Sequence, residues 1–207
     1  VEGGRARGVR LRDGTEVEAR QLVVSGTSPQ QLCLRLLPAE LIPARVRRRV
    51  ENLETREATI TWYDYALHEL PRYLAAEFNP DVGQCGWLVL TNRDEDRLVK
   101  EHAWIHLGRY PRPGVTTMVI CPHSAFDPTR APEGKHLVKT ETPCIPATCL
   151  SEREWLRFKR EQAEEELREW RKFAPNMTWD NVIGYMALTP YDSANLLNMQ
   201  PEGNMGS

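Results

Sequence analysis

Residues 151–170 read SEREWLRFKREQAEEELREW and carry the clearest structural signal in the chain. Ser151 and Glu154 have the spacing of a capping box, in which each side chain accepts a hydrogen bond from a backbone donor at a helix N-terminus. Apolar side chains then recur at helical spacing at Trp155, Phe158, Leu167 and Trp170. We therefore expect a long amphipathic helix that ends at Pro175 and packs its aromatic stripe on another layer of the fold.

Strand and helix patterns precede this helix without a fixed alternation. Residues rich in β-formers and compact apolar runs predict strands at 58–67, 86–90, 116–121 and 136–141. Helical spacing predicts helices at 94–107 and after Pro43. Because the elements do not follow a strict βαβ order, we expect an α+β fold, with a mainly antiparallel sheet and flanking helices.

The first 30 residues have a different pattern. Residues 5–11 and 16–25 predict the two arms of a β-hairpin around a tight turn at Asp13-Gly14, and the second arm ends in the apolar run Leu22-Val23-Val24, expected to be buried. Ser28 and Pro29 then predict an N-cap and the first residue of a helix. Since the chain starts at Val1 inside a strand-like pattern, we expect that a preceding part is missing or that an alternative start codon was used.

Composition narrows the class of protein. The formal net charge of −2 over 207 residues argues against a dedicated nucleic-acid surface, and the basic run 45–49 is interpreted as the solvated face of a helix. Five widely spaced cysteines, an odd number, indicate a reducing compartment, and we expect a cytoplasmic protein. No apolar run reaches the roughly 18 residues that a transmembrane helix needs.

No catalytic group can be assigned from the residues alone. His102 and His106 share a helical face but supply too few ligands for a metal site, so no metal is expected. Ser25 lies at a strand-to-helix turn without the glycines of a nucleophile elbow. Cys121 and His123 are separated by a rigid proline and are interpreted as structural. The carboxylates of Asp64, Glu69 and Glu77 have no spacing that pairs them for acid–base chemistry.

Several segments nevertheless resemble one protein family, and they follow one another in the same order as in that family. The hairpin 8–19 followed by Val-Val-Ser-Gly-Thr-Ser-Pro at 23–29 is similar to the hairpin and V-V-S-N-A-D-P strand of phytoene-dehydrogenase-like flavoproteins, with Gly26 and Thr27 departing from Asn and Ala. Residues 124–136, SAFDPTRAPEGKH, resemble that family's S-x-x-D-P-x-x-A-P-x-G-K-H segment. Residues 174–176 and 188–192 resemble its A-P-N and L-T-P-x-D, and 202–206 its return segment toward the flavin domain.

The resemblance implies an internal fragment of an FAD-dependent oxidoreductase that acts on a lipophilic, unsaturated, isoprenoid-like substrate. It implies that 1–30 belong to the edge of a flavin-binding domain, 31–190 to the substrate domain and 191–207 to a return segment. Val24, Ser25 and Gly26 would lie near FAD in the parent protein only, because the chain has no G-x-G-x-x-G of its own. The residues expected to line the substrate cavity are Trp62, Tyr63, Tyr65, Trp87, Trp104 and Met118.

Other interpretations remain open. The six cavity candidates could instead be ordinary core residues, because aromatic side chains dominate core packing. The chain could be a stand-alone, self-associating binding module, and we expect a homodimer because a fragment exposes surface that its parent would cover. A hydrolase of hydrophobic esters or lactones, using Ser25 or another serine with a histidine, is a third possibility.

Overall fold

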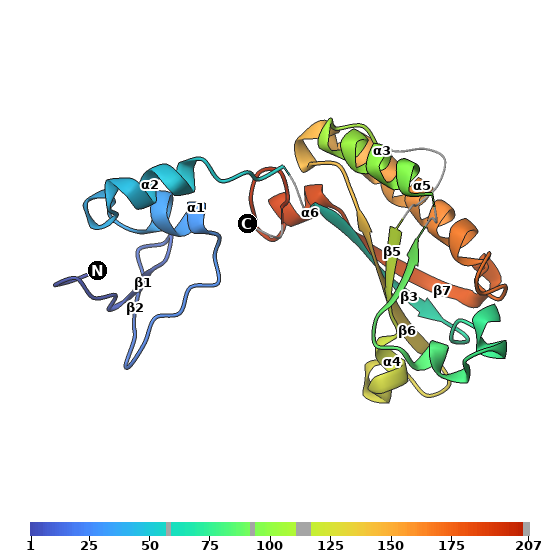
Figure 1. Cartoon of the computed structure of the whole chain (residues 1–207). Coiled ribbons are helices and arrows are strands. Elements are labelled where there is room, and N and C mark those ends of the chain that lie inside the picture. Colours follow the sequence, from blue (N-terminus) through green and yellow to red (C-terminus); the bar gives the residue numbers. More distant parts are fainter. Residues whose placement is uncertain (57–58, 92–93, 111–116, 205–207) are drawn as a thin grey trace. The chain divides into compact units, whose positions relative to one another are not determined.

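The computed structural model describes residues 1–56, 59–91, 94–110 and 117–204. The chain divides into two compact units, one formed mainly by residues 1–54 and the other by residues 55–206 (Figure 1). This division differs in position from the boundaries at residues 30 and 190 expected from the sequence. Those boundaries describe membership in a larger protein and stay a prediction.

The first unit is a short hairpin followed by helical turns. Its elements are β1 (Gly8–Arg10), β2 (Glu16–Glu18), α1 (Pro29–Gln31), the π-helical turn η1 (Leu32–Leu36), the 3₁₀ turn η2 (Ala39–Leu41) and α2 (Ala44–Glu51). The tight turn at Asp13-Gly14 is confirmed, and Gly14 adopts the left-handed φ of +87° that such a turn favours. The Ser28 hydroxyl caps α1 through the Gln31 amide, as expected.

The expectation for residues 19–25 is wrong. The second strand ends at Glu18, because β1 offers it a partner over only three residues. Leu22 and Val24 are 76% and 82% exposed, so the apolar run that was expected to be buried lies open.

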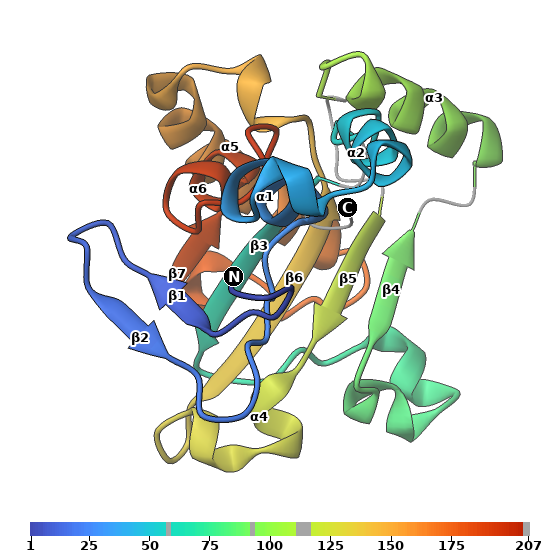
Figure 2. The same cartoon turned by 90° about the vertical axis from the view of Figure 1, so that its left-hand side faces the viewer.

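The second unit is a five-stranded antiparallel sheet in the order β4-β5-β6-β3-β7 (Figure 2). Its strands are β3 (Ile60–Leu67), β4 (Leu88–Thr91), β5 (Thr117–Cys121), β6 (His136–Pro143) and β7 (Val182–Leu188). Its α-helices are α3 (Glu95–His106), α4 (His123–Phe126), α5 (Glu152–Trp170) and α6 (Pro190–Asn195). The 3₁₀ turns are η3 (Leu74–Glu77), η4 (Pro80–Gln84), η5 (Pro128–Arg130), η6 (Ala147–Cys149) and η7 (Trp179–Asn181).

The α+β class with a mainly antiparallel sheet and flanking helices is confirmed. Each strand expected in residues 58–141 is present within one or two residues, and the apolar stretch 182–188 forms the edge strand β7. Of the expected strand ends, Ala58 and Thr116 lie outside the described residues. Helix α5 begins with the expected capping box at Ser151 and Glu154.

Helix α5 covers one face of the sheet and forms the core there (Figure 1). The Tyr63 hydroxyl donates to the Lys159 carbonyl oxygen at 3.0 Å, and the Tyr65 ring meets Trp170 edge to face at 6.0 Å between centroids. The Glu166 carboxylate lies fully buried between α5 and the sheet. Because strand side chains alternate in direction, this packing leaves the second set of side chains on the opposite face.

Candidate functional site

The face of the sheet opposite α5 brings polar and apolar side chains together across three strands. Asp64 on β3 pairs in register with Lys139 on β6 and with Met186 on β7. In the adjoining row, Ala66 pairs with Leu137 and Gly184. These residues occupy the positions that alternate with the core residues of the same strands, so the register alone places them side by side.

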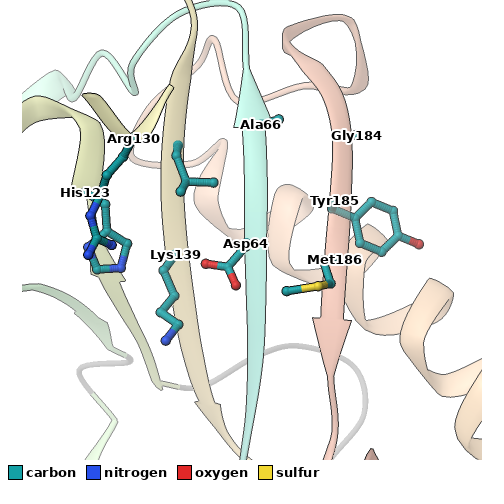
Figure 3. Close-up of a pocket in the computed structure, with 9 residues that line it drawn as sticks. Asp64, Ala66, His123, Arg130, Lys139, Gly184, Tyr185 and Met186 are labelled. Carbon is teal, nitrogen blue, oxygen red and sulfur yellow. The ribbon is translucent and has the colours of Figure 1, made fainter. Parts of the chain in front are cut away.

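A pocket of about 570 Å³ lies on this face, within the size range of small-molecule sites (Figure 3). Its lining residues come from the three strands and from the segment after β5, and they are Asp64, Ala66, His123, Arg130, Leu137, Lys139, Gly184, Tyr185 and Met186. Ala66 and Gly184 are small, and a methyl group in place of a Gly184 hydrogen would meet no atom within 4 Å. Small side chains at adjacent positions therefore leave the space that makes the hollow.

The charged groups of the pocket are loosely paired. Lys139 Nζ lies 4.0 Å from Glu141 Oε1 and 5.5 Å from the centroid of the Trp62 ring, while Trp62 Nε1 donates to Glu141 at 3.1 Å. Asp64 stands directly opposite Lys139, yet its carboxylate forms no hydrogen bond or ion pair with any described residue. An unpaired carboxylate at the floor of a pocket is available to a bound molecule.

His123 and Arg130 form the side of the pocket next to β6 (Figure 3). His123 is the first residue of α4, and Arg130 ends η5, where its Nε lies 3.6 Å from Asp127 Oδ2. Partial burial lowers the pKa of the His123 ring, and the positive charges of Arg130 and Lys139 lower it further. The imidazole is therefore favoured in its neutral form, beside two permanent cations.

The segments that resemble the flavoprotein family have structural roles here. The Ser124 hydroxyl accepts a hydrogen bond from the Leu137 amide at 2.9 Å and fixes α4 against β6. The Asn176 side chain accepts from the Arg72 amide at 2.8 Å and donates to the Leu70 carbonyl oxygen at 2.9 Å. These bonds hold the segments that connect the strands, and the Ser124–Leu137 bond lies next to the pocket residues His123 and Leu137.

The third such segment continues β7 into α6. Thr189 and Asp192 form a capping box, and Asp192 Oδ1 also accepts from Lys159 Nζ on α5 at 2.7 Å. Burial alone would raise the pKa of Asp192, but the hydrogen bonds from Lys159 and Thr189 outweigh it and hold that pKa below its ordinary value. The L-T-P-x-D pattern is thus explained as a strand end, a cap and a tether to the long helix.

The six residues expected to line a substrate cavity are separated by the fold. Tyr63, Tyr65 and Met118 are buried on the α5 side of the sheet, whereas Trp62 lies on the open face beside the pocket. Trp87 and Trp104 are 69% and 42% exposed and do not line the pocket. Of the six, the geometry places only Trp62 near the pocket, and their role as substrate-lining residues stays a prediction.

Sequence reasoning missed the pocket residues His123, Arg130 and Lys139 as a group. A signal for part of the site was present, because Trp62, Asp64 and Ala66 alternate with the apolar core positions of one strand. No signal in the sequence could join them to Arg130, which reaches the pocket only through the turn between α4 and β6. The sequence offers Asp64 as a candidate carboxylate, and the sheet adds its neighbours Lys139 and Met186.

The residues expected near a flavin do not form a dinucleotide site by themselves. Val24, Ser25 and Gly26 lie in an irregular segment of the first unit, and the Ser25 hydroxyl is 2.8 Å from that of Thr27. The α-helix that follows spans only Pro29–Gln31, and Gly26 is the single glycine between residues 15 and 82. A flavin pyrophosphate binds at a glycine-rich turn followed by a helix N-terminus, so Val24, Ser25 and Gly26 by themselves do not fit a pyrophosphate.

The remaining candidates offer no site among the described residues. His102 lies on α3 with its Nδ1 2.9 Å from the Leu98 carbonyl oxygen. No described group of three or more His, Cys, Asp or Glu side chains is placed to hold a metal ion. The described cysteines are all free thiols. Among the described helices, none has the length and apolar character to cross a bilayer.

The chain is similar in sequence to two known proteins, and one solved structure aligns with most of it. No protein-family model matches the chain. Over 98% of its length it is similar to the "Pyridine nucleotide-disulfide oxidoreductase domain-containing protein 2" of Mus musculus, with 30% identity, and to the protein of that name from Rattus norvegicus, with 29% identity. The chain spans 35% of each of these two proteins. A solved structure of an oxidoreductase from Methanosarcina mazei aligns with 91% of this chain and 35% of that chain, at a TM-score of 0.45 and 17% identity.

Proposed function

We propose that this chain is the substrate-side part of an NAD(P)/FAD-type oxidoreductase. The observation that carries the proposal is the similarity to the mouse and rat proteins, which are named for an oxidoreductase domain and match along nearly the whole chain. The pocket on the open face of the sheet supports the proposal, because it is a hollow of the size that small molecules occupy. The open face has space for a ligand, whereas the α5 face is filled by core side chains.

FAD is the cofactor in this proposal, and residues outside this chain would supply its pyrophosphate site. The flavin performs the redox chemistry when bound, and the surrounding protein supplies orientation and a shaped cavity. Residues 24–26 would then lie at the border of the flavin-binding part. The contribution of this chain is to hold the substrate on the sheet.

A lipophilic, unsaturated substrate is the finer part of the proposal. The pocket floor offers the apolar surface of Ala66, Leu137 and Met186, and Trp62 lies in the next row of the same face. Apolar contact of this kind favours a hydrocarbon segment through the hydrophobic effect. The charged groups at the side of the pocket leave room for one polar end of such a substrate.

Filling the pocket tests the proposal. In protein expressed from the complete reading frame around this chain, Gly184→Trp should abolish substrate-dependent reduction of the flavin while leaving bound flavin unchanged. Gly83→Trp is the matched control, because an added methyl group at Gly83 also meets no atom within 4 Å and Gly83 does not line the pocket. Equal reduction rates in the two variants, measured anaerobically with a panel of unsaturated lipids, would show that the pocket does not take the substrate.

A further inference from the structure

We propose that the pocket on the open sheet face binds the anionic head group, a carboxylate or a phosphate, of an otherwise apolar ligand. This inference rests on the proposed function and narrows its substrate class from any lipophilic molecule to an amphiphilic anion. The parts of the pocket that carry it are the basic side formed by His123, Arg130 and Lys139 and the small-residue floor formed by Ala66 and Gly184.

The basic side draws on three separate elements. His123 comes from α4, Arg130 from η5 and Lys139 from β6, and all three line the same hollow (Figure 3). Nitrogen-bearing side chains that converge from different elements give a ligand oxygen several donors at once. Charge-assisted hydrogen bonds from Arg and Lys to a carboxylate or phosphate are among the stronger polar contacts in proteins.

The acids next to these cations hold them weakly. The Arg130–Asp127 and Lys139–Glu141 contacts are 3.6 Å and 4.0 Å long, beyond the 2.7–3.2 Å of an ordinary N–H···O hydrogen bond. The Glu141 carboxylate is also engaged by Trp62. A ligand anion could therefore bind to both Arg130 and Lys139 without breaking a close ion pair within the described residues.

The two cations also act on the His123 ring. Part of the lowering of the His123 pKa comes from Arg130 and Lys139, after the larger effect of burial, so these two charges disfavour protonation of the ring. Asp64 and Glu141 act on the ring in the opposite direction with smaller effect. The neutral His123 ring has one N–H donor, and an anion bound beside it would favour the protonated ring, which has two.

Asp64 determines how the ligand is oriented in the pocket. Its carboxylate faces the pocket on the β3 side of Lys139, while His123 and Arg130 lie on the other side of that lysine (Figure 3). A negative head group is repelled by Asp64 and therefore settles against His123 and Arg130. The hydrocarbon part then extends over Ala66 and Gly184 toward Met186, where the floor is apolar and open.

Binding of simple amphiphiles to the 207-residue chain tests the inference. The probes are dodecanoate, dodecyl phosphate, the neutral dodecanol and the cationic dodecyltrimethylammonium, titrated calorimetrically below their micelle concentrations. The anions should bind more tightly than the alcohol and the cation, and whichever anion binds better identifies the head group. Arg130→Gln should weaken anion binding about tenfold, because it removes a charge-assisted contact. Asp64→Asn should strengthen anion binding about threefold, because it removes a repulsion between partly exposed charges.

Two control variants separate this site from general attraction to basic surfaces. Arg157→Gln changes an exposed arginine on α5, and Arg48→Gln changes an exposed arginine on α2, and both should leave the affinities unchanged. Equal binding of dodecanol and dodecanoate would overturn the anionic head group while leaving a lipophilic site in place. Anion binding that survives Arg130→Gln, or that falls equally in Arg48→Gln, would overturn the site itself. The Gly184→Trp experiment on flavin reduction judges the proposed function independently of these outcomes.

Discussion

Replacing Glu166 by alanine should destabilise the second unit by about 4 kcal/mol. The buried carboxylate accepts hydrogen bonds from Thr140 at 2.6 Å, Thr142 at 2.8 Å, Tyr65 at 3.1 Å and Gln162 at 3.3 Å. Thr142 can turn to Thr61, whose hydroxyl is 2.9 Å away, but the other donors lose their acceptor. Three orphaned donors cost at least about 1 kcal/mol each, and the cavity adds roughly 1 kcal/mol, which gives the total of about 4 kcal/mol.

Urea unfolding followed by circular dichroism measures this loss, with the m-value expected to stay constant. Glu164→Ala is the matched control on the exposed side of the same helix and should change stability by less than about 0.5 kcal/mol. A loss below about 1 kcal/mol for Glu166→Ala would refute the reasoning, because it would mean that the donors around the carboxylate find other partners at no cost.

Glu166→Gln separates charge from hydrogen bonding. Burial raises the pKa of Glu166 above 4.5, although the four donors act to lower it, so the folded protein binds this proton more tightly than the unfolded chain. Its contribution to stability is therefore fully present below pH 4.5 and is lost as the pH rises through the folded value. Glutamine cannot titrate, and the difference in stability between wild type and Glu166→Gln should vary with pH in this window. A difference that is constant with pH would contradict the assignment.

Three further predictions concern other parts of the chain. Asn176→Ala should cost about 2 kcal/mol in urea unfolding, because two main-chain groups lose their partner, and a loss under about 0.5 kcal/mol would count against this role. The contact with Lys159 holds the pKa of Asp192 low, so the wild type has a stabilisation above pH 3.8 that is lost as the pH falls below that value. Asp192→Asn should remove this stabilisation, and thermal melts of the two proteins that coincide at every pH would disprove the prediction. We also expect the chain to form a dimer through its first 30 residues, so that Leu22→Asp with Val24→Asp yields monomers in light scattering; a wild type that is monomeric at high micromolar concentration would rule this out.

The sequence is most informative where the structure depends on residues that are close together along the chain. The capping box at Ser151 and the aromatic stripe of α5 are local patterns, and the structure confirms both. The strands were also located, because β-branched and aromatic runs between turns mark them well. The expected arm 16–25 failed because a strand needs a partner, and β1 ends after three residues.

The candidate site was harder to predict because it depends on register. Asp64, Lys139 and Met186 become neighbours only when β3 lies between β6 and β7, and no local pattern specifies that order. Alternation along β3 points the buried side chains of Tyr63 and Tyr65 toward α5, and their expected role at a substrate cavity stays a prediction. Knowing which face α5 covers is what divides core residues from pocket residues.

Flavin content in two proteins tests the central proposal most directly. One is the 207-residue chain, and the other is the product of the complete reading frame that contains it, both purified and titrated with FAD by quenching of flavin fluorescence. We predict that the longer protein is yellow and carries FAD, whereas the 207-residue chain is colourless and binds none at micromolar concentration, because its sequence contains no G-x-G-x-x-G. A longer protein without flavin, or a reading frame that encodes only these residues, would contradict the assignment to an FAD-dependent oxidoreductase.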